Sequence, residues 1–102
     1  MARSGKNHWL RYLGTLRGSG RLSLRNGNES LGAISYEIEG FGSQFARSAN
    51  GQIEGDSTVL TQAFRAGRAS ILLSDGLSVA VVLTDPQGGS TAEVVVSGSF
   101  PL

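Results

Sequence analysis

Alternation between apolar and polar residues is the feature that most restricts how this chain can fold. In Leu77–Leu83 and in Ile34–Ile38, an apolar side chain occupies every second position. A period of two places one face of a β-strand against a core, whereas an amphipathic helix needs apolar residues three and four positions apart. These segments therefore predict strands, and the domain is expected to be mainly β.

Turn-forming residues join the predicted strands into hairpins. Asp75-Gly76 favours a two-residue type I′ turn, which needs positive φ angles at both central residues. Asn26-Gly27-Asn28 marks a second hairpin, and Asp85-Pro86 ends a strand because proline has no N–H to donate to a sheet. The strands expected on this basis cover residues 21–25, 31–41, 52–55, 69–74, 77–84 and 92–99.

Residues 9–17 fit either a helix or a strand. Gly14 and the following Gly18-Ser19-Gly20 favour a strand that ends in a turn, and we predict a strand here. The apolar residues with helical spacing, which favour the alternative, are Trp9, Leu13 and Leu16. The fifteen glycines are spread along the chain at turn-like intervals, which is typical of many short strands.

Residues 57–66 are the one expected helix. Asp56 or Ser57 can cap its N-terminus, and Gly67 stands where a C′ residue belongs. A helix of about three turns must rely on packing for its stability. Its apolar stripe would consist of Val59, Leu60, Ala63 and Phe64.

The expected elements give a small antiparallel β-barrel or sandwich of six to seven strands with one short helix. The order of three strands, a helix and further strands resembles the OB-type barrel, by element order alone. Residues 9–102 are expected to form a single β-rich domain, preceded by a flexible basic tail at residues 1–8. The aromatic residues expected on core-facing positions are Tyr36, Phe41 and Phe64.

Charge is distributed unevenly along the chain. Residues 1–28 contain six of the nine basic residues and no acid, whereas all eight acids follow from Glu29 onward, so a net charge of +1 hides a basic first quarter. Arginines interleaved with aromatic residues are typical of single-stranded nucleic-acid binding, in which cations contact phosphates and rings stack on bases. The residues of this alternative site are Arg11, Arg17, Arg21, Arg25, Trp9 and Tyr12.

Pairing between strands offers a competing explanation of the same charges. If Leu22 lies opposite Ile34, then Arg21 comes within diagonal reach of Glu37. The same register places Arg17 opposite Glu39, and cross-strand pairs of opposite charge contribute about 0.2–1 kcal/mol each. Arg17, Arg21 and Arg25 would then be neutralised by the neighbouring strand, which leaves Arg3, Lys6 and Arg11 as the basic excess.

Catalytic and metal-binding patterns are scarce. The chain has no cysteine, and its single histidine, His8, lies in the predicted tail. Glu37 with Glu39, and Glu54 with Asp56, could act as acid and base or hold a cation, which makes a small acid–base enzyme our third hypothesis. Their alternative role is a solvated strand face. We assign no catalytic residue, cofactor or metal and expect a non-enzymatic domain.

Two strands carry apolar residues on their outer faces as well, at Val82 and Val95. Such strands are usually covered on both sides, here by the helix or by a second subunit. We expect a domain that acts by binding or self-assembly, as a homo-oligomer, with Val82, Val95 and Phe100 at the interface. No stretch approaches about 18 consecutive apolar residues, and no signal peptide is recognised, so we expect a cytoplasmic chain without a membrane span.

Overall fold

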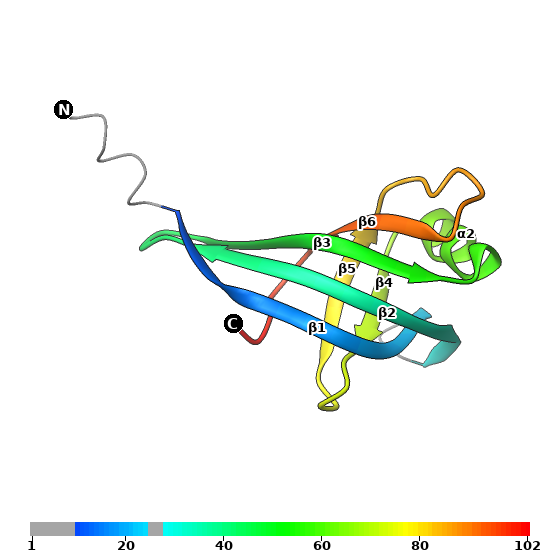
Figure 1. The fold of residues 1–102 in the computed structure, drawn as a ribbon, viewed down its shortest axis with the longest axis horizontal. Helices are drawn as coiled ribbons and strands as arrows, with labels where there is room; N and C mark the ends of the chain where they lie inside the picture. Colours follow the sequence, from blue (N-terminus) through cyan, green and yellow to red (C-terminus); the bar gives the residue numbers. More distant parts are fainter. Residues whose placement is uncertain (1–9, 25–27) are drawn as a thin grey trace.

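The strands of this chain close into a six-stranded barrel (Figure 1). The computed structural model describes residues 10–24 and 28–102. Neighbouring strands are antiparallel and follow the order β1-β2-β3-β6-β5-β4, with β4 pairing back onto β1. The elements are β1 (Arg11–Leu24), β2 (Glu29–Gly42), β3 (Arg47–Gly55), α2 (Ser57–Ala66), β4 (Ala69–Leu72), β5 (Ser78–Leu83) and β6 (Thr91–Val96). The predicted mainly β fold with one short helix is confirmed, and closure decides for the barrel over the sandwich.

Strand β1 is one long strand where the sequence predicted two. The segment from Arg11 to Arg17 is a strand, as expected, but the turn expected at Gly18-Ser19-Gly20 is wrong. These three residues pair with β2 in mid-strand, Gly18 opposite Tyr36. A Cβ atom on Gly18 would lie 2.9 Å from the hydroxyl oxygen of Tyr36, so the glycine makes room for this ring.

Strand β3 is longer than the predicted 52–55 because its first half is polar and gives no strand signal. Its pairing with β2 runs from Ile34↔Gly55 to Gly42↔Arg47. A Cβ atom on Gly51 would lie 2.0 Å from the carbonyl oxygen of Glu37, so β2 approaches β3 closely here. Glycine at an inward position therefore allows this strand pair to bend around the barrel.

The β4–β5 hairpin has a different turn from the predicted type I′ turn. Leu73 donates its N–H to the carbonyl of Leu77, and Gly76 donates to the carbonyl of Leu73. Gly76 has a φ of 93°, whereas Asp75 is not among the positive-φ residues of the described chain. The loop therefore has three residues, with glycine in the left-handed position, and Asp75 Oδ1 accepts from the Leu77 N–H instead.

The barrel consists of two three-stranded meanders connected by α2. Strands β1, β2 and β3 form the first, and β4, β5 and β6 form the second. The OB-type barrel has five strands in a Greek-key arrangement. The resemblance in element order therefore does not extend to the pairing, because β6 is an added strand that pairs antiparallel with β3.

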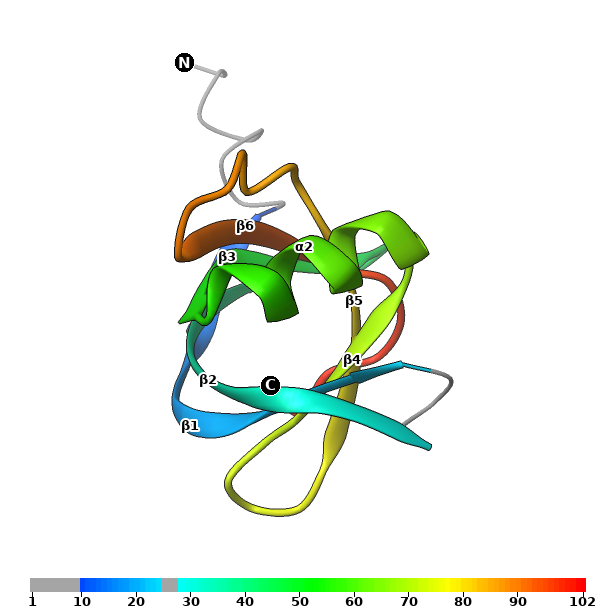
Figure 2. The same ribbon diagram turned by 90° about the vertical axis from the view of Figure 1, so that its right-hand side faces the viewer.

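Helix α2 covers one end of the barrel (Figure 2). Its predicted bounds and caps are confirmed: Asp56 Oδ1 accepts from the Thr58 N–H at 2.9 Å, and Gly67, with a φ of 85°, donates to the Phe64 carbonyl. Leu60 is fully buried in the core. The residues buried with it from the strands include Leu22, Ile38, Ile53, Ile71, Val79, Val81 and Val94.

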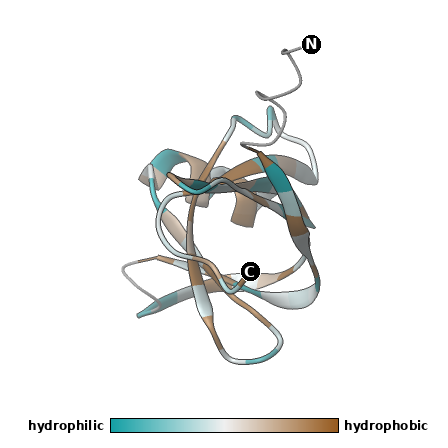
Figure 3. Ribbon diagram, turned by 90° about the vertical axis from the view of Figure 1, so that its left-hand side faces the viewer, coloured by the Kyte–Doolittle hydropathy of each residue, from teal (hydrophilic) through white to brown (hydrophobic). Residues whose placement is uncertain are grey.

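The C-terminal residues 97–102 cover the opposite end. Figure 3 looks into this end, and the last residue lies over the barrel opening. A Cβ atom on Gly40 would lie 2.8 Å from the Phe100 ring and 2.7 Å from the Leu102 side chain, so both side chains pack against the inner face of β2 near its C-terminal end. Phe100 is buried in the core of its own chain and does not lie on the outer face with the other two predicted interface residues.

Candidate interaction surface

The outer face of β1, β2, β3 and β6 carries a regular grid of polar side chains. Arg17 lies opposite Glu37, which lies opposite Gln52 on the next strand, and Gln52 lies opposite Glu93. The neighbouring row runs from Glu39 through Asn50 to Val95 and Val82. A third row, on the other side of Glu37, contains Ser19, Ser35, Glu54 and Thr91.

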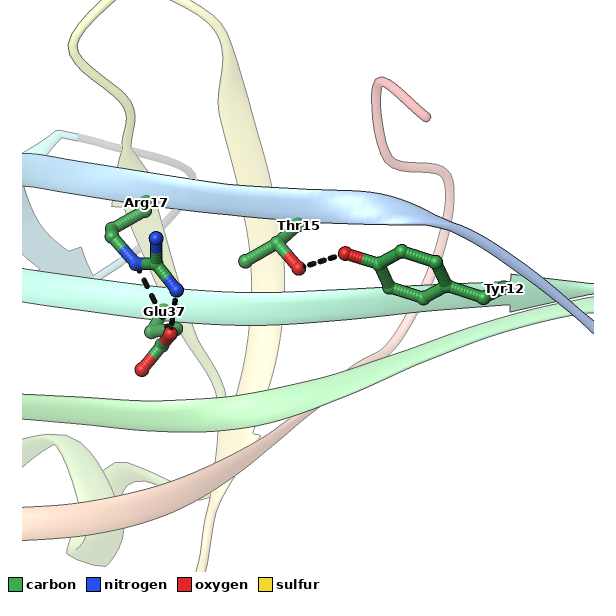
Figure 4. A network of polar contacts seen from close by, with 4 residues as sticks. All are labelled: Tyr12, Thr15, Arg17 and Glu37. Carbon is green, nitrogen blue, oxygen red and sulfur yellow. Dashed lines mark hydrogen bonds and ion pairs between the residues drawn. The ribbon is translucent and has the colours of Figure 1, made fainter.

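Arg17 and Glu37 form an ion pair across β1 and β2 (Figure 4). Both Nε and Nη2 of Arg17 donate to Oε2 of Glu37, the first at 3.0 Å. This hydrogen bond, together with the negative charge of Glu37, raises the pKa of Arg17. The glutamates of β2 thus neutralise Arg17 as predicted, although its expected partner was Glu39.

The predicted register was wrong by two residues because β1 and β2 pair closer to their turn than expected. Leu22 lies opposite Gly32, not Ile34, and pairing continues to Leu24. Arg21 consequently lies opposite Ala33, and its Nε donates to the hydroxyl of Ser30 at 3.0 Å.

Two adjoining hollows of about 560 and 580 Å³ lie on this outer face and share Glu37 and Gln52 in their walls. Arg17 and Glu54 line the first, and Glu39 and Glu93 line the second. We call the surface around both hollows the acidic face. Its four carboxylates and one guanidinium, which carry a formal charge of −3, are Glu37, Glu39, Glu54, Glu93 and Arg17.

The carboxylates of the third hypothesis divide between two roles. Glu37, Glu39 and Glu54 lie exposed on the acidic face, whereas Asp56 caps α2. Within the part of the chain that the structure describes, no group of three or more acidic or histidine side chains could hold a metal ion. His8 lies outside the described residues.

Val82 and Val95 lie opposite each other on β5 and β6 and point outward, as the alternation predicted. Val82 is 40% exposed and Val95 is 55% exposed. Val95 also lines the second hollow, beside Asn50 and Glu39. The outer face therefore places an apolar pair next to hydrogen-bonding groups.

A group of aromatic and basic residues lies at the projecting end of β1, β2 and β3. The Tyr12 and Phe41 rings contact each other at 5.9 Å between centroids. Phe45 is 78% exposed in the turn between β2 and β3, where the Ser43 hydroxyl accepts from its N–H. We call this region the aromatic end and define it by Arg11, Tyr12, Phe41, Phe45 and Arg47. Arg11 and Arg47 both lie opposite the inward-facing Gly42, on the other side of the sheet from Tyr12 and Phe41, and the Arg47 guanidinium carbon lies 4.8 Å from the centroid of the Phe100 ring.

A bulge in β1 creates the Tyr12–Phe41 contact. The register shifts between Tyr12 and Gly14, so Leu13 is the extra residue and turns inward against Gly42. Tyr12 then lies on the outer face, where its hydroxyl contacts Thr15 (Figure 4). The expectation that Phe41 faces the core is wrong, because Phe41 shares the outward alternation of Glu37 and Glu39.

The structure separates the residues of the predicted nucleic-acid site. Arg11 and Tyr12 lie at the aromatic end, Arg17 is ion-paired, and Arg21 lies towards the other end of β1. Trp9 and Arg25 lie outside the described residues. Sequence reasoning missed Phe45 and Arg47, which the long β2–β3 hairpin brings to the same end of the barrel as Arg11.

Comparisons with known proteins found no relative of this chain. No protein-family model matches the chain, and neither the curated proteins nor the solved structures include a significant match. In residues 10–24 and 28–102, no helix is long and apolar enough to cross a membrane.

Proposed function

We propose that this chain is a non-enzymatic binding domain that acts by self-association, and that the acidic face with its Val82–Val95 pair is its contact surface. The observation that carries the proposal is that the exposed Val95 lines a polar hollow and that the exposed Val82 lies opposite it on the next strand. Protein interfaces commonly have an apolar centre surrounded by hydrogen-bonding groups that exclude water. Val95 and Val82 supply apolar surface of this kind, and Asn50 and Glu39 supply hydrogen-bonding groups beside it in the same row.

Substitution of Val95 tests this surface directly. Val95→Lys places a charge in the apolar centre and is expected to weaken self-association by roughly tenfold or more, since each 1.4 kcal/mol corresponds to a factor of ten. Ser78→Lys is the matched control, because Ser78 is exposed on the same barrel but away from the hollows. Sedimentation velocity over a wide range of protein concentration gives both dissociation constants. Equal values for the two variants would contradict the proposed surface.

A second candidate function is binding of single-stranded nucleic acid at the aromatic end. The observation in its favour is that Tyr12, Phe45 and Arg11 lie at the same end of the barrel, which provides rings for stacking and a cation for phosphates. Binding of a labelled single-stranded oligonucleotide should then weaken steeply with salt. Fluorescence anisotropy at low and high salt, with Arg11→Ala for comparison, measures this.

A further inference from the structure

We infer that self-association is head-to-tail: the aromatic end of one copy docks on the acidic face of the next. This inference rests on the proposed function and adds which surface of the second copy makes the contact. The two surfaces are different patches of the same chain, so one copy can use its aromatic end and its acidic face with two different neighbours.

The charges of the two surfaces are complementary. The aromatic end carries the exposed Arg11, whereas the Arg47 guanidinium packs over the Phe100 ring, and residues 10–24 and 40–53 contain no acidic side chain. The acidic face carries a formal charge of −3, as defined above. Complementary potentials of this kind select partners and fix how they are oriented.

Three carboxylates of the acidic face are available to a partner. Glu37 is occupied by Arg17, but no basic side chain of residues 10–24 and 28–102 forms an ion pair with Glu39, Glu54 or Glu93. An arginine from a second copy could therefore bind these carboxylates without displacing an existing pair. Arginine is well suited to this role because its planar guanidinium donates two parallel hydrogen bonds to one carboxylate.

The apolar parts of the two surfaces also fit. Two exposed valines alone provide far less than the roughly 800 Å² that each partner contributes to a stable interface. Phe45 and Tyr12 are 78% and 59% exposed, and they provide the large aromatic surface that such interfaces concentrate at their centre. Docking of these rings against Val95 would cover apolar surface on both copies.

One chain cannot make this contact with itself. Phe45 and Asn50 are five positions apart in the same hairpin, about 17 Å of extended chain, and β3 is held between β2 and β6. The aromatic end therefore cannot fold back onto the acidic face of its own barrel. The occupant must be a second molecule.

A second copy explains the charge distribution better than a polyanion does. The whole chain has a net charge of only +1. Nucleic acid bound at the aromatic end would lie near Glu39, two residues from Phe41, and the acidic face would repel it. A second copy uses the positive and the negative surface together. Head-to-tail contacts of this kind form rings if the rotation closes and open chains if it does not.

Mixing two complementary variants tests the inference. One carries Arg11→Ala with Phe45→Ser and keeps an intact acidic face. The other carries Glu39→Arg with Glu93→Arg and keeps an intact aromatic end. Each alone is expected to stay monomeric in sedimentation velocity, whereas an equimolar mixture should form a heterodimer and nothing larger, because one intact surface remains on each partner. Arg65→Glu, on the exposed side of α2, is the charge control and should associate like the unmodified chain.

The possible outcomes separate the two proposals. If the unmodified chain associates but the mixture stays monomeric, the head-to-tail arrangement is overturned while self-association stands. If the unmodified chain is monomeric at every concentration, the proposed function itself fails. Association of the unmodified chain should also weaken as salt shortens the Debye length from about 10 Å at 0.1 M to about 3 Å at 1 M. Salt-independent association would also overturn the inference.

Discussion

Tyr36 shows how far sequence reasoning reaches at the scale of a single residue. Alternation along Ile34–Ile38 correctly placed its ring inside the barrel, where it is 5% exposed. The partner of its hydroxyl could not be predicted, because Ser74 is distant in sequence and comes close only when the barrel closes. The Ser74 N–H donates to the Tyr36 hydroxyl at 3.1 Å, which ties the β4–β5 loop to β2.

Tyr36→Phe should lower the free energy of unfolding by about 1 kcal/mol, because the Ser74 N–H loses its acceptor while the ring keeps its packing. Denaturant unfolding measures the change. Tyr12→Phe is the matched control: its hydroxyl contacts Thr15 on an exposed surface, so its removal should leave stability unchanged. An equal loss in both variants would show that the Tyr36 hydrogen bond has no special contribution.

The strands and the helix differed in how well sequence could predict them. Residues 57–66 carry their own N-cap and C′ glycine, and such local signals gave the correct helix. The glycines of the long strands misled the prediction, because glycine in a turn and glycine at an inward strand position look alike in a sequence. Gly18 and Gly51 lie inside strands, where their role depends on Tyr36 and on the backbone of β2.

Gly51→Ala should destabilise the barrel by more than about 3 kcal/mol, since its Cβ would collide with the Glu37 carbonyl oxygen and backbone must move. Gly67→Ala is the comparison: its Cβ would meet nothing within 4 Å, but its φ of 85° disfavours alanine. Its cost should be about 1 kcal/mol. Thermal and denaturant unfolding measure both. A Gly51→Ala chain as stable as Gly67→Ala would contradict the close approach of β2 and β3.

At the scale of the whole molecule, the class of fold was predictable, but the choice between a closed barrel and a sandwich was not. Alternation and turns gave an antiparallel β-domain, whereas the pairing that closes the barrel joins Arg21 to Leu72 without any local signal. The spacing of Glu37 and Glu39 indicated that these two carboxylates of the acidic face share one side of a strand. The aromatic end could not be predicted, because Phe45 and Arg47 lie in a polar segment with no strand signal.

The C-terminal segment, residues 97–102, is expected to unfold together with the barrel in one cooperative transition. Phe100 is 7% exposed, packs against Gly40 and lies 4.8 Å, centroid to guanidinium carbon, from Arg47. Phe100→Ala should therefore cost about 3–5 kcal/mol, because it leaves a cavity at one end of the core. A loss of that size is a large share of the 5–15 kcal/mol typical of a domain.

Phe45→Ala makes the same chemical change at a side chain that is 78% exposed and should leave the free energy of unfolding unaltered. Denaturant unfolding of both variants should show one transition with the slope of the unmodified chain, since the exposed surface in each unfolded state is similar. If residues 97–102 unfolded separately from the barrel, the Phe100→Ala variant would keep the denaturant midpoint of the unmodified chain. The barrel would then be closed at this end by its strands alone, and Phe100 would be free to contact a second copy as the sequence first suggested.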